Sequence, residues 1–352
     1  MTAEVPHILK YKGYLKAHGG WVTSLAVGEE LVGQNKVEFL ISGSRDRTLI
    51  KWELDEKKDD DEDKEWGKPK KMYTGKFKRF FIISLGHSHF VSEVCLTSDS
   101  RFAFSSSWDG SVRFWNIATG KTIQQLIGHT KDVLSVSVHP NDRQFITGGL
   151  DHNIKVWNTK GECKHTVDKN QHTDAVSCVK FYHAHKPEIV VTASWDKTIK
   201  VWDNLYMQLM YTFTGHKAQI NSIDTVQNST YLASGSRDGT VMIWDLVKGK
   251  WLTQNEVDSP VNVVLFSQKL FWLVVGTQEG IKVIDLPSNK IIQTIQEVSN
   301  INANDVSFKS HKKLGCTSLA WSKSQTHLYS GWTDNNIRVY KIDVASHEWA
   351  IS

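Results

Sequence analysis

Short runs in which apolar and polar residues alternate recur along almost the whole chain. In residues 133–138 and 198–202, for example, roughly every second residue is apolar, which is the period of a β-strand with one buried face. Glycine, aspartate and asparagine separate the runs, and these residues favour turns. The pattern therefore predicts an all-β protein built from many short strands.

Five of these stretches are copies of one sequence. Each copy has an Asp six residues before a Trp, a Ser or Thr four residues before that Asp, and a His farther upstream. The five sets are His18, Ser42, Asp46 and Trp52; His87, Ser105, Asp109 and Trp115; His129, Thr147, Asp151 and Trp157; His172, Thr192, Asp196 and Trp202; and His216, Ser234, Asp238 and Trp244.

Two weaker copies follow, which brings the number of repeats to seven. Residues 274–285 carry Glu279 and Ile284 where Asp and Trp are expected. Residues 329–340 keep Ser330 and Asp334 but end in Tyr340. A unit of about forty residues with several short strands and a Gly-His and Trp-Asp pattern is typical of a propeller blade.

The repeat resembles that of the WD-repeat family. This resemblance implies a seven-bladed β-propeller in which Trp, Ser or Thr, His and Asp form a hydrogen-bonded tetrad in each complete blade. Unpaired strand edges promote aggregation, so the segment Ile8–Leu15 is predicted to complete the seventh blade and close the ring. Residues 1–352 are then expected to form a single domain.

Residues 53–85 interrupt the series between the first and second copies. Their charges are mostly acidic up to Glu65 and basic from Lys68 to Arg79. We expect a solvated loop between blades 1 and 2. The alternative is a basic arm, formed by residues 68–71 and 76–79, that contacts an anionic surface.

Composition narrows the class of protein without fixing its partner. The 352 residues are 40% hydrophobic and 23% charged, as in a folded domain, and the net charge of +4 neither proves nor excludes nucleic-acid binding. No apolar run reaches the roughly 18 residues of a membrane span and no signal peptide is evident, so we expect a cytoplasmic protein. The four cysteines lie far apart, which predicts buried or half-buried thiols and neither a zinc site nor disulfides.

An enzyme is the weaker interpretation. Ser42, His18 and Asp46 are the residue types of a catalytic triad, but the same set occurs five times, whereas a catalytic site occurs once in a domain. The sequence has no phosphate-binding glycine loop and no HExxH motif. The paired histidines at 87 and 89 and at 183 and 185 have no acidic or cysteine partner nearby. We therefore predict no catalytic residue, no metal and no cofactor.

The candidate binding residues are cations. Because the tetrad joins each Asp-bearing turn to a Gly-His loop, these turns and loops are predicted to share one face of the ring. The cations expected on this face are Arg45, Arg47, Lys131, Lys197, Lys217 and Arg237. Fixed cations of this kind suit phosphates or acidic protein surfaces, although ordinary solvated charges are the alternative.

Four segments resemble the receptors for activated C kinase, which are WD-repeat scaffolds of the small ribosomal subunit. They are residues 44–48, 86–92, 128–136 and 316–321. The resemblance implies docking on ribosomal RNA and ribosomal proteins through Arg45, Arg47, Lys131 and Lys197, with Arg47 where lysine is commonest. It also implies recruitment of protein kinases, such as protein kinase C, and of other signalling proteins that regulate translation. Residues 281–286 align with a segment implicated in kinase binding, with Ile284 in place of Trp.

The alternative function is a free cytosolic module similar to a G-protein β subunit, acting off the ribosome. A true β subunit needs an N-terminal coiled coil for its partner, and residues 1–17 carry no heptads.

Overall fold

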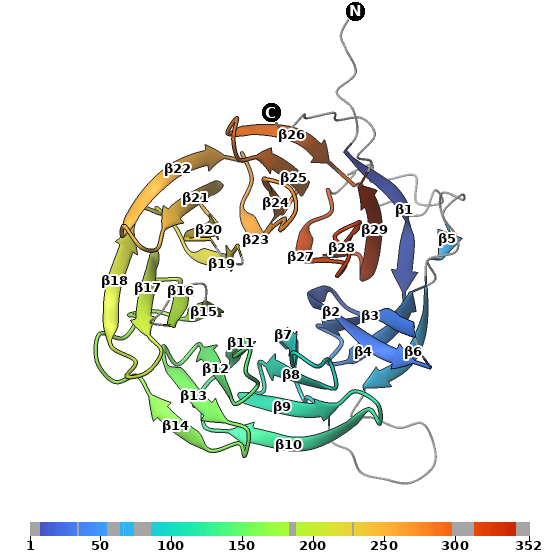
Figure 1. Ribbon diagram of the computed structural model, residues 1–352, viewed down its shortest axis with the longest axis horizontal. Coiled ribbons are helices and arrows are strands. Elements are labelled where there is room, and N and C mark those ends of the chain that lie inside the picture. Colours follow the sequence, from blue (N-terminus) through green and yellow to red (C-terminus); the bar gives the residue numbers. More distant parts are fainter. Residues whose placement is uncertain are drawn as a thin grey trace, which may run out of the picture.

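The computed structural model describes residues 8–33, 35–54, 64–65, 67–73, 86–182, 188–226, 229–297 and 313–342. Figure 1 shows seven sheets arranged as a closed ring in sequence order, from the blue β2 round to the red β29. The described residues form strands and turns and no helix, so none of them forms a helix that could cross a membrane. The prediction of an all-β, seven-bladed propeller is confirmed.

The strands of blades 1–6 follow the chain from the centre of the ring outward. Blade 1 contains β2 (Val22–Val32), β3 (Asn35–Ser44), β4 (Leu49–Leu54) and β6 (Gly67–Tyr73). Blade 2 contains β7 (Val91–Leu96), β8 (Phe102–Ser107), β9 (Ser111–Asn116) and β10 (Lys121–Ile127). Blade 3 contains β11 (Val133–Val138), β12 (Gln144–Gly149), β13 (Ile154–Asn158) and β14 (Cys163–Thr166).

The second half of the ring repeats this order. Blade 4 contains β15 (Val176–Tyr182), β16 (Ile189–Ser194), β17 (Thr198–Asp203) and β18 (Leu209–Thr214). Blade 5 contains β19 (Ile220–Thr225), β20 (Tyr231–Ser236), β21 (Thr240–Asp245) and β22 (Lys250–Glu256). Blade 6 contains β23 (Val261–Phe266), β24 (Trp272–Thr277), β25 (Gly280–Asp285) and β26 (Lys290–Ile295).

Blade 7 is built from both ends of the described chain. It contains β27 (Cys316–Trp321), β28 (His327–Trp332), β29 (Asn336–Ile342) and β1 (Leu9–Lys16), with β5 (Lys64–Glu65) beside β1. The blue β1 lies antiparallel against the red β29 in Figure 1, with Leu9 opposite Ile342 and Lys16 opposite Asn336. Gln293 of blade 6 also accepts a hydrogen bond from the Leu9 amide at 2.8 Å. The ring is therefore closed by the N-terminal strand.

The structure corrects the expectation of a loop over residues 53–85 for the part of this range that it describes, residues 53–54, 64–65 and 67–73. The strand β4 extends to Leu54, and β6 pairs antiparallel with β4 as the outer strand of blade 1. The basic run 68–71 therefore lies within a strand of the blade and does not form a separate arm. Residues 76–79, the other half of that predicted arm, fall outside the described residues.

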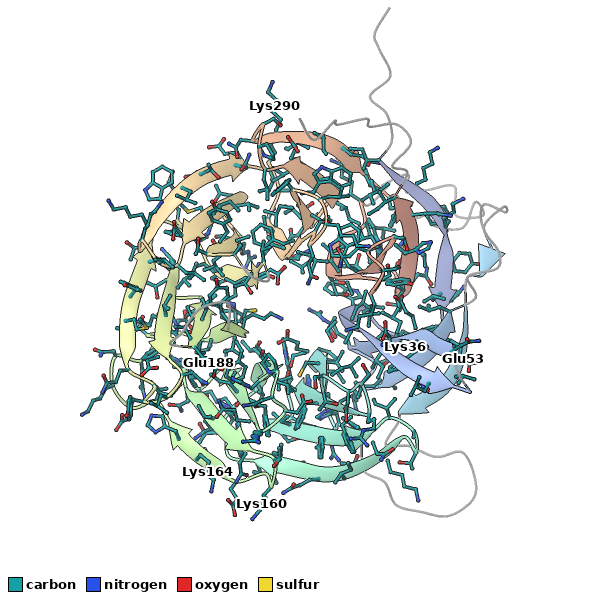
Figure 2. The ribbon with its side chains drawn as sticks, viewed as in Figure 1. Lys36, Glu53, Lys160, Lys164, Glu188 and Lys290 are labelled. Carbon is teal, nitrogen blue, oxygen red and sulfur yellow. The ribbon has the colours of Figure 1, made fainter. Side chains whose placement is uncertain are left out.

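The hydrophobic core lies between neighbouring blades. One cluster joins Ile146 and Ile154 of blade 3 to Val176 and Trp202 of blade 4, and the Trp202 side chain is fully buried. Figure 2 shows side chains filling the space between adjacent sheets, whereas the labelled Lys160 and Lys290 point outward from the rim. The blades are therefore held to one another mainly by apolar packing.

The cysteines differ from expectation at one position. Cys178 and Cys316 are buried and Cys95 is half-buried, but Cys163 is exposed. All four are free thiols. Burial raises the pKa of Cys178 to about 11, so this thiol stays protonated at neutral pH.

Candidate functional site

One tight turn recurs on the same side of the ring and places the candidate residues. It joins the second and third strands of each blade and contains the repeated aspartate. The residue after that aspartate adopts the left-handed conformation in six blades, with φ between 65° and 78°, at Arg47, Gly110, His152, Lys197, Gly239 and Asn335. We call the surface formed by these turns and the adjoining histidine loops the turn face.

In blades 1–5 the tetrad holds the turn in place. In blade 1 the Trp52 indole donates to the Ser42 hydroxyl at 2.8 Å, this hydroxyl donates to His18 Nε2 at 2.6 Å, and His18 Nδ1 donates to Asp46 at 2.8 Å. Every donor and acceptor in this buried chain has a partner, which is the condition under which a buried polar network is stabilising.

The structure brings together the other four predicted tetrads in the same way. The corresponding bonds are formed by His87, Ser105, Asp109 and Trp115; by His129, Thr147, Asp151 and Trp157; by His172, Thr192, Asp196 and Trp202; and by His216, Ser234, Asp238 and Trp244. The longest of them is the 3.3 Å contact between His216 and Asp238.

Burial and hydrogen bonding set opposite protonation preferences in the two ionisable groups of the tetrad. Burial lowers the pKa of His87, His172 and His216, although the neighbouring aspartates oppose the shift. Burial alone would raise the pKa of Asp46, but hydrogen bonds from His18, Thr48 and the Gly19 amide lower it to about 2. The pKa values of Asp109, Asp196 and Asp238 are lowered in the same way, so in blades 2, 4 and 5 the network pairs a neutral imidazole with an ionised carboxylate at neutral pH.

The same contacts make the hydroxyls of the Ser–His–Asp sets inaccessible from solvent. The Ser42, Ser105 and Ser234 side chains are fully buried, and each oxygen already accepts the indole N–H. A substrate carbonyl could not reach them without opening the blade. Each set is therefore arranged as a hydrogen-bonded network inside its blade.

Blade 6 replaces its polar network with apolar side chains. Val257, Val275 and Ile284 stand at the positions of the histidine, serine and tryptophan, and all three are fully buried in one cluster. Blade 7 uses a substitute donor: the Trp332 indole lies two residues after Ser330 and donates to its hydroxyl at 2.7 Å. The sequence did not reveal this contact, because Trp332 does not align with the other tryptophans.

The four predicted docking cations lie on the turn face. Arg47, Lys131 and Lys197 are exposed, and none of the three forms an ion pair within the part of the chain that the structure describes. A Cβ atom added at Gly110 would lie 3.4 Å from the Lys131 carbonyl, so Lys131 of blade 3 borders the turn of blade 2. Arg45 differs from the others because it is half-buried.

Arg45 lies in a cluster that sequence reasoning missed. Its guanidinium carbon is 3.9 Å from the Trp21 ring centroid and 5.5 Å from that of Phe90. Trp108 lies 5.4 Å from Phe90 and is stacked on His89 at 5.8 Å with an interplanar angle of 13°. We call Trp21, Arg45, His89, Phe90 and Trp108 the aromatic–arginine cluster.

A repeated backbone contact explains how this cluster forms. The amide before each repeated aspartate donates to the carbonyl that precedes the first strand of the blade, at 2.8–3.0 Å. In blade 1 this contact pairs Arg45 with Trp21, and in blade 2 it pairs Trp108 with Phe90. Aligning these two repeat positions would have identified the pairs from the sequence.

Residues 281–286 do not form an exposed surface. They belong largely to β25, which lies between β24 and β26, and Ile281, Val283 and Ile284 are fully buried. The kinase-binding role that the sequence resemblance implied for this segment is therefore not supported by its position in the blade.

Comparison with known proteins identifies the repeat. The family described as WD domain, G-beta repeat matches residues 9–53, 78–116, 120–158, 161–203, 207–245 and 305–341. The longest unmatched stretch, residues 246–304, contains blade 6, the blade in which the tetrad is replaced by valine and isoleucine.

Two curated relatives match over almost their full lengths. The small ribosomal subunit protein RACK1 of Drosophila melanogaster is 38% identical over 96% of this chain and 99% of its own. The cross-pathway control WD-repeat protein 2 of Flammulina velutipes is 37% identical over 95% of this chain and 98% of its own.

Proposed function

The chain belongs to the WD-repeat family, and from this premise we propose that it is a non-enzymatic scaffold of the small ribosomal subunit. It acts in the cytoplasm and docks on ribosomal RNA and neighbouring ribosomal proteins through the turn face of blades 1–4. The remaining surface recruits protein kinases and other signalling proteins that regulate translation. The similarity to a small ribosomal subunit protein supports this assignment.

The observation that carries the docking proposal is the conformation of Arg47. This residue is exposed and left-handed, with φ of 71°, where blades 2 and 5 have the glycines Gly110 and Gly239. A left-handed conformation costs a non-glycine residue about 1–2 kcal/mol, so the turn itself does not require arginine. Because the turn fixes the backbone of Arg47, only the side chain has conformational entropy to lose when the guanidinium binds a phosphate bidentately.

Lys197 supplies the same arrangement in blade 4. It is also exposed and left-handed, with φ of 72°. Together with Lys131 it extends the cationic surface beyond blade 1. Several such contacts make affinity for RNA strongly dependent on salt, because each neutralised phosphate releases counterions.

The test replaces Arg47 by glycine, the residue found at this position of the turn in blades 2 and 5. We expect Arg47→Gly to fold at least as stably as the wild type, since it removes backbone strain. Its affinity for the small subunit is expected to fall about tenfold or more. Arg47→Glu is expected to weaken binding further. The measurement is co-sedimentation with purified small subunits in sucrose gradients at several salt concentrations. Lys160→Glu, which makes the same charge reversal at the outer rim, is the matched control (Figure 2). Undiminished co-sedimentation of folded Arg47→Glu would exclude this turn as the anchor.

A further inference from the structure

The aromatic–arginine cluster has a composition that neither the tetrads nor the docking cations explain. Its two tryptophans are among the exposed large apolar side chains, with 38% of Trp21 and 37% of Trp108 accessible. Neither indole belongs to a tetrad. Both lie on the turn face, so they occupy the same surface as the docking cations.

The planar groups of the cluster are ordered by their neighbours. Arg45 is held between the Trp21 ring of its own blade and the Phe90 ring of blade 2. His89 is stacked almost parallel to Trp108, and its Nδ1 accepts a hydrogen bond from the Phe90 amide at 2.8 Å. The rings and the guanidinium have therefore lost much of their conformational freedom before any partner binds, which lowers the entropic cost of stacking.

The charges around the cluster favour an anionic partner. Arg47 belongs to the same turn as Arg45, and Lys131 borders the turn that begins at Trp108. Aromatic rings beside fixed cations form the usual platform for unpaired nucleotides, because bases stack on the rings while the cations contact the phosphates. A duplex hides its base faces and offers only phosphates and groove edges to such a surface.

We propose that the aromatic–arginine cluster binds unpaired RNA nucleotides, whose bases stack on Trp108 and Trp21 while Arg47 and Lys131 contact the adjoining phosphates. This inference rests on the proposed docking function and specifies the nucleic acid: single-stranded RNA at blades 1 and 2. Arg45 is a positioning residue, since it holds Trp21 and Phe90 in place.

The experiment compares single-stranded and duplex RNA on the full chain. Fluorescence anisotropy measures the binding of a labelled oligoadenylate and of a labelled RNA duplex of equal length. We expect tighter binding of the oligoadenylate, and quenching of tryptophan emission when the unlabelled strand is added. Stacking of a base on an aromatic side chain contributes about 1–3 kcal/mol, so Trp108→Ala is expected to weaken oligoadenylate binding about tenfold.

Three matched variants separate stacking from charge and from folding. Trp108→Phe keeps a ring and is expected to retain affinity within about threefold. Trp251→Ala removes an indole that is 57% exposed on the outer strand β22 and is expected to bind like the wild type. Arg47→Gly is expected to weaken binding of both RNAs and to reduce the salt dependence by about one phosphate contact.

The possible results distinguish failure of this inference from failure of the docking proposal. If folded Trp108→Ala keeps its affinity for oligoadenylate, or loses affinity for the duplex equally, the cluster does not read unpaired bases. If Trp108→Ala loses co-sedimentation with small subunits but still binds oligoadenylate, the cluster contacts a ribosomal protein, and the docking proposal stands without this inference. If oligoadenylate binding depends on Trp108 but the wild type does not co-sediment with small subunits, the docking proposal fails and the stacking platform stands.

Discussion

At the scale of single residues, a tetrad member can be replaced at little cost when its partners change with it. In blade 6 the three positions hold Val257, Val275 and Ile284, which pack against one another without a polar atom to satisfy. A single change in an intact tetrad has a different result, because the remaining buried groups lose a partner and keep their desolvation cost. The loss of stability therefore comes from the buried polar group that has lost its hydrogen-bond partner.

Blade 3 provides the test of this argument. Asp151 accepts hydrogen bonds from His129 Nδ1 at 2.9 Å and from the Thr130 amide at 3.0 Å. We expect Asp151→Ala to lower the free energy of unfolding by roughly 1–3 kcal/mol at neutral pH, because the imidazole N–H and the amide lose their acceptor. Urea denaturation monitored by tryptophan fluorescence measures the difference.

The difference in unfolding free energy between the wild type and Asp151→Ala is predicted to depend on pH. Burial would raise the pKa of Asp151, but hydrogen bonds from His129, Thr130 and Asn153 lower it overall. A carboxylate with a depressed pKa stabilises the folded state above its unfolded pKa of about 3.9, and this contribution is lost as the pH falls toward the folded pKa. The gap between wild type and Asp151→Ala should therefore narrow in acid. A gap that is constant with pH would mean that the mutation acts through packing.

At the scale of strands, side chains near the start of each inner strand link the blades through hydrogen bonds. Six of seven blades place a hydroxyl or amide here, which donates to a backbone carbonyl of the next blade. These donors are Thr23, Ser92, Ser177, Asn221, Asn262 and Thr317. Blade 3 has Leu134 at this position and lacks this donor, so its inner strand is joined to that of blade 4 by the hydrogen bond from the Val179 amide to the Ser135 hydroxyl but not by the repeated link.

Restoring the missing link is a prediction at this scale. Leu134→Asn keeps the shape of the side chain and supplies the amide that Asn221 and Asn262 use in blades 5 and 6. Leu134 is half-buried and lines a central cavity of about 230 Å³, so the substitution loses less apolar burial than it would at a fully buried leucine. We expect the free energy of unfolding to rise by about 0.5–1 kcal/mol. Leu134→Ala adds no donor and should lower the free energy of unfolding. If Leu134→Asn lowers it as well, packing between blades 3 and 4 outweighs the hydrogen bond.

The inner strands also show which features a sequence can predict. The Ser or Thr, Asp and Trp of the tetrad recur at fixed spacing with a His upstream, so repetition alone indicated that Ser42, His18 and Asp46 have a structural role. The strand β6 was missed because Lys68, Pro69 and Lys70 show no alternation of apolar residues, and its place is set by pairing with β4. The aromatic–arginine cluster was missed because its residues are far apart in the chain: Arg45 contacts Trp21 only when blade 1 folds, and Phe90 only when blades 1 and 2 pack together.

At the scale of the whole molecule, the ring depends on the pairing of its two ends. The strand β1 contributes Leu15, which is fully buried against Leu40 of blade 1 and against Tyr329 and Ile337 of blade 7. Hydrogen bonds between Leu9 and Gln293 connect the same strand to blade 6. One strand therefore joins three blades, so its loss affects more than one packing interface.

Removing this strand tests how the ring closes. Deletion of residues 1–15 takes away the outer partner of β29 and uncovers the apolar residues beneath it, so we expect a large loss of thermal stability or insoluble expression. If the truncated protein cannot be purified, Leu15→Ala tests the same contacts. The cavity left by this substitution is expected to lower the free energy of unfolding by about 2–5 kcal/mol. Lys16→Ala, an exposed neighbour in the same strand, is the control and should melt like the wild type. The expectation is wrong if the truncated protein is monomeric in size-exclusion chromatography and melts like the parent. Blades 1, 6 and 7 would then hold together without β1, and the ring would close by apolar packing between blades alone.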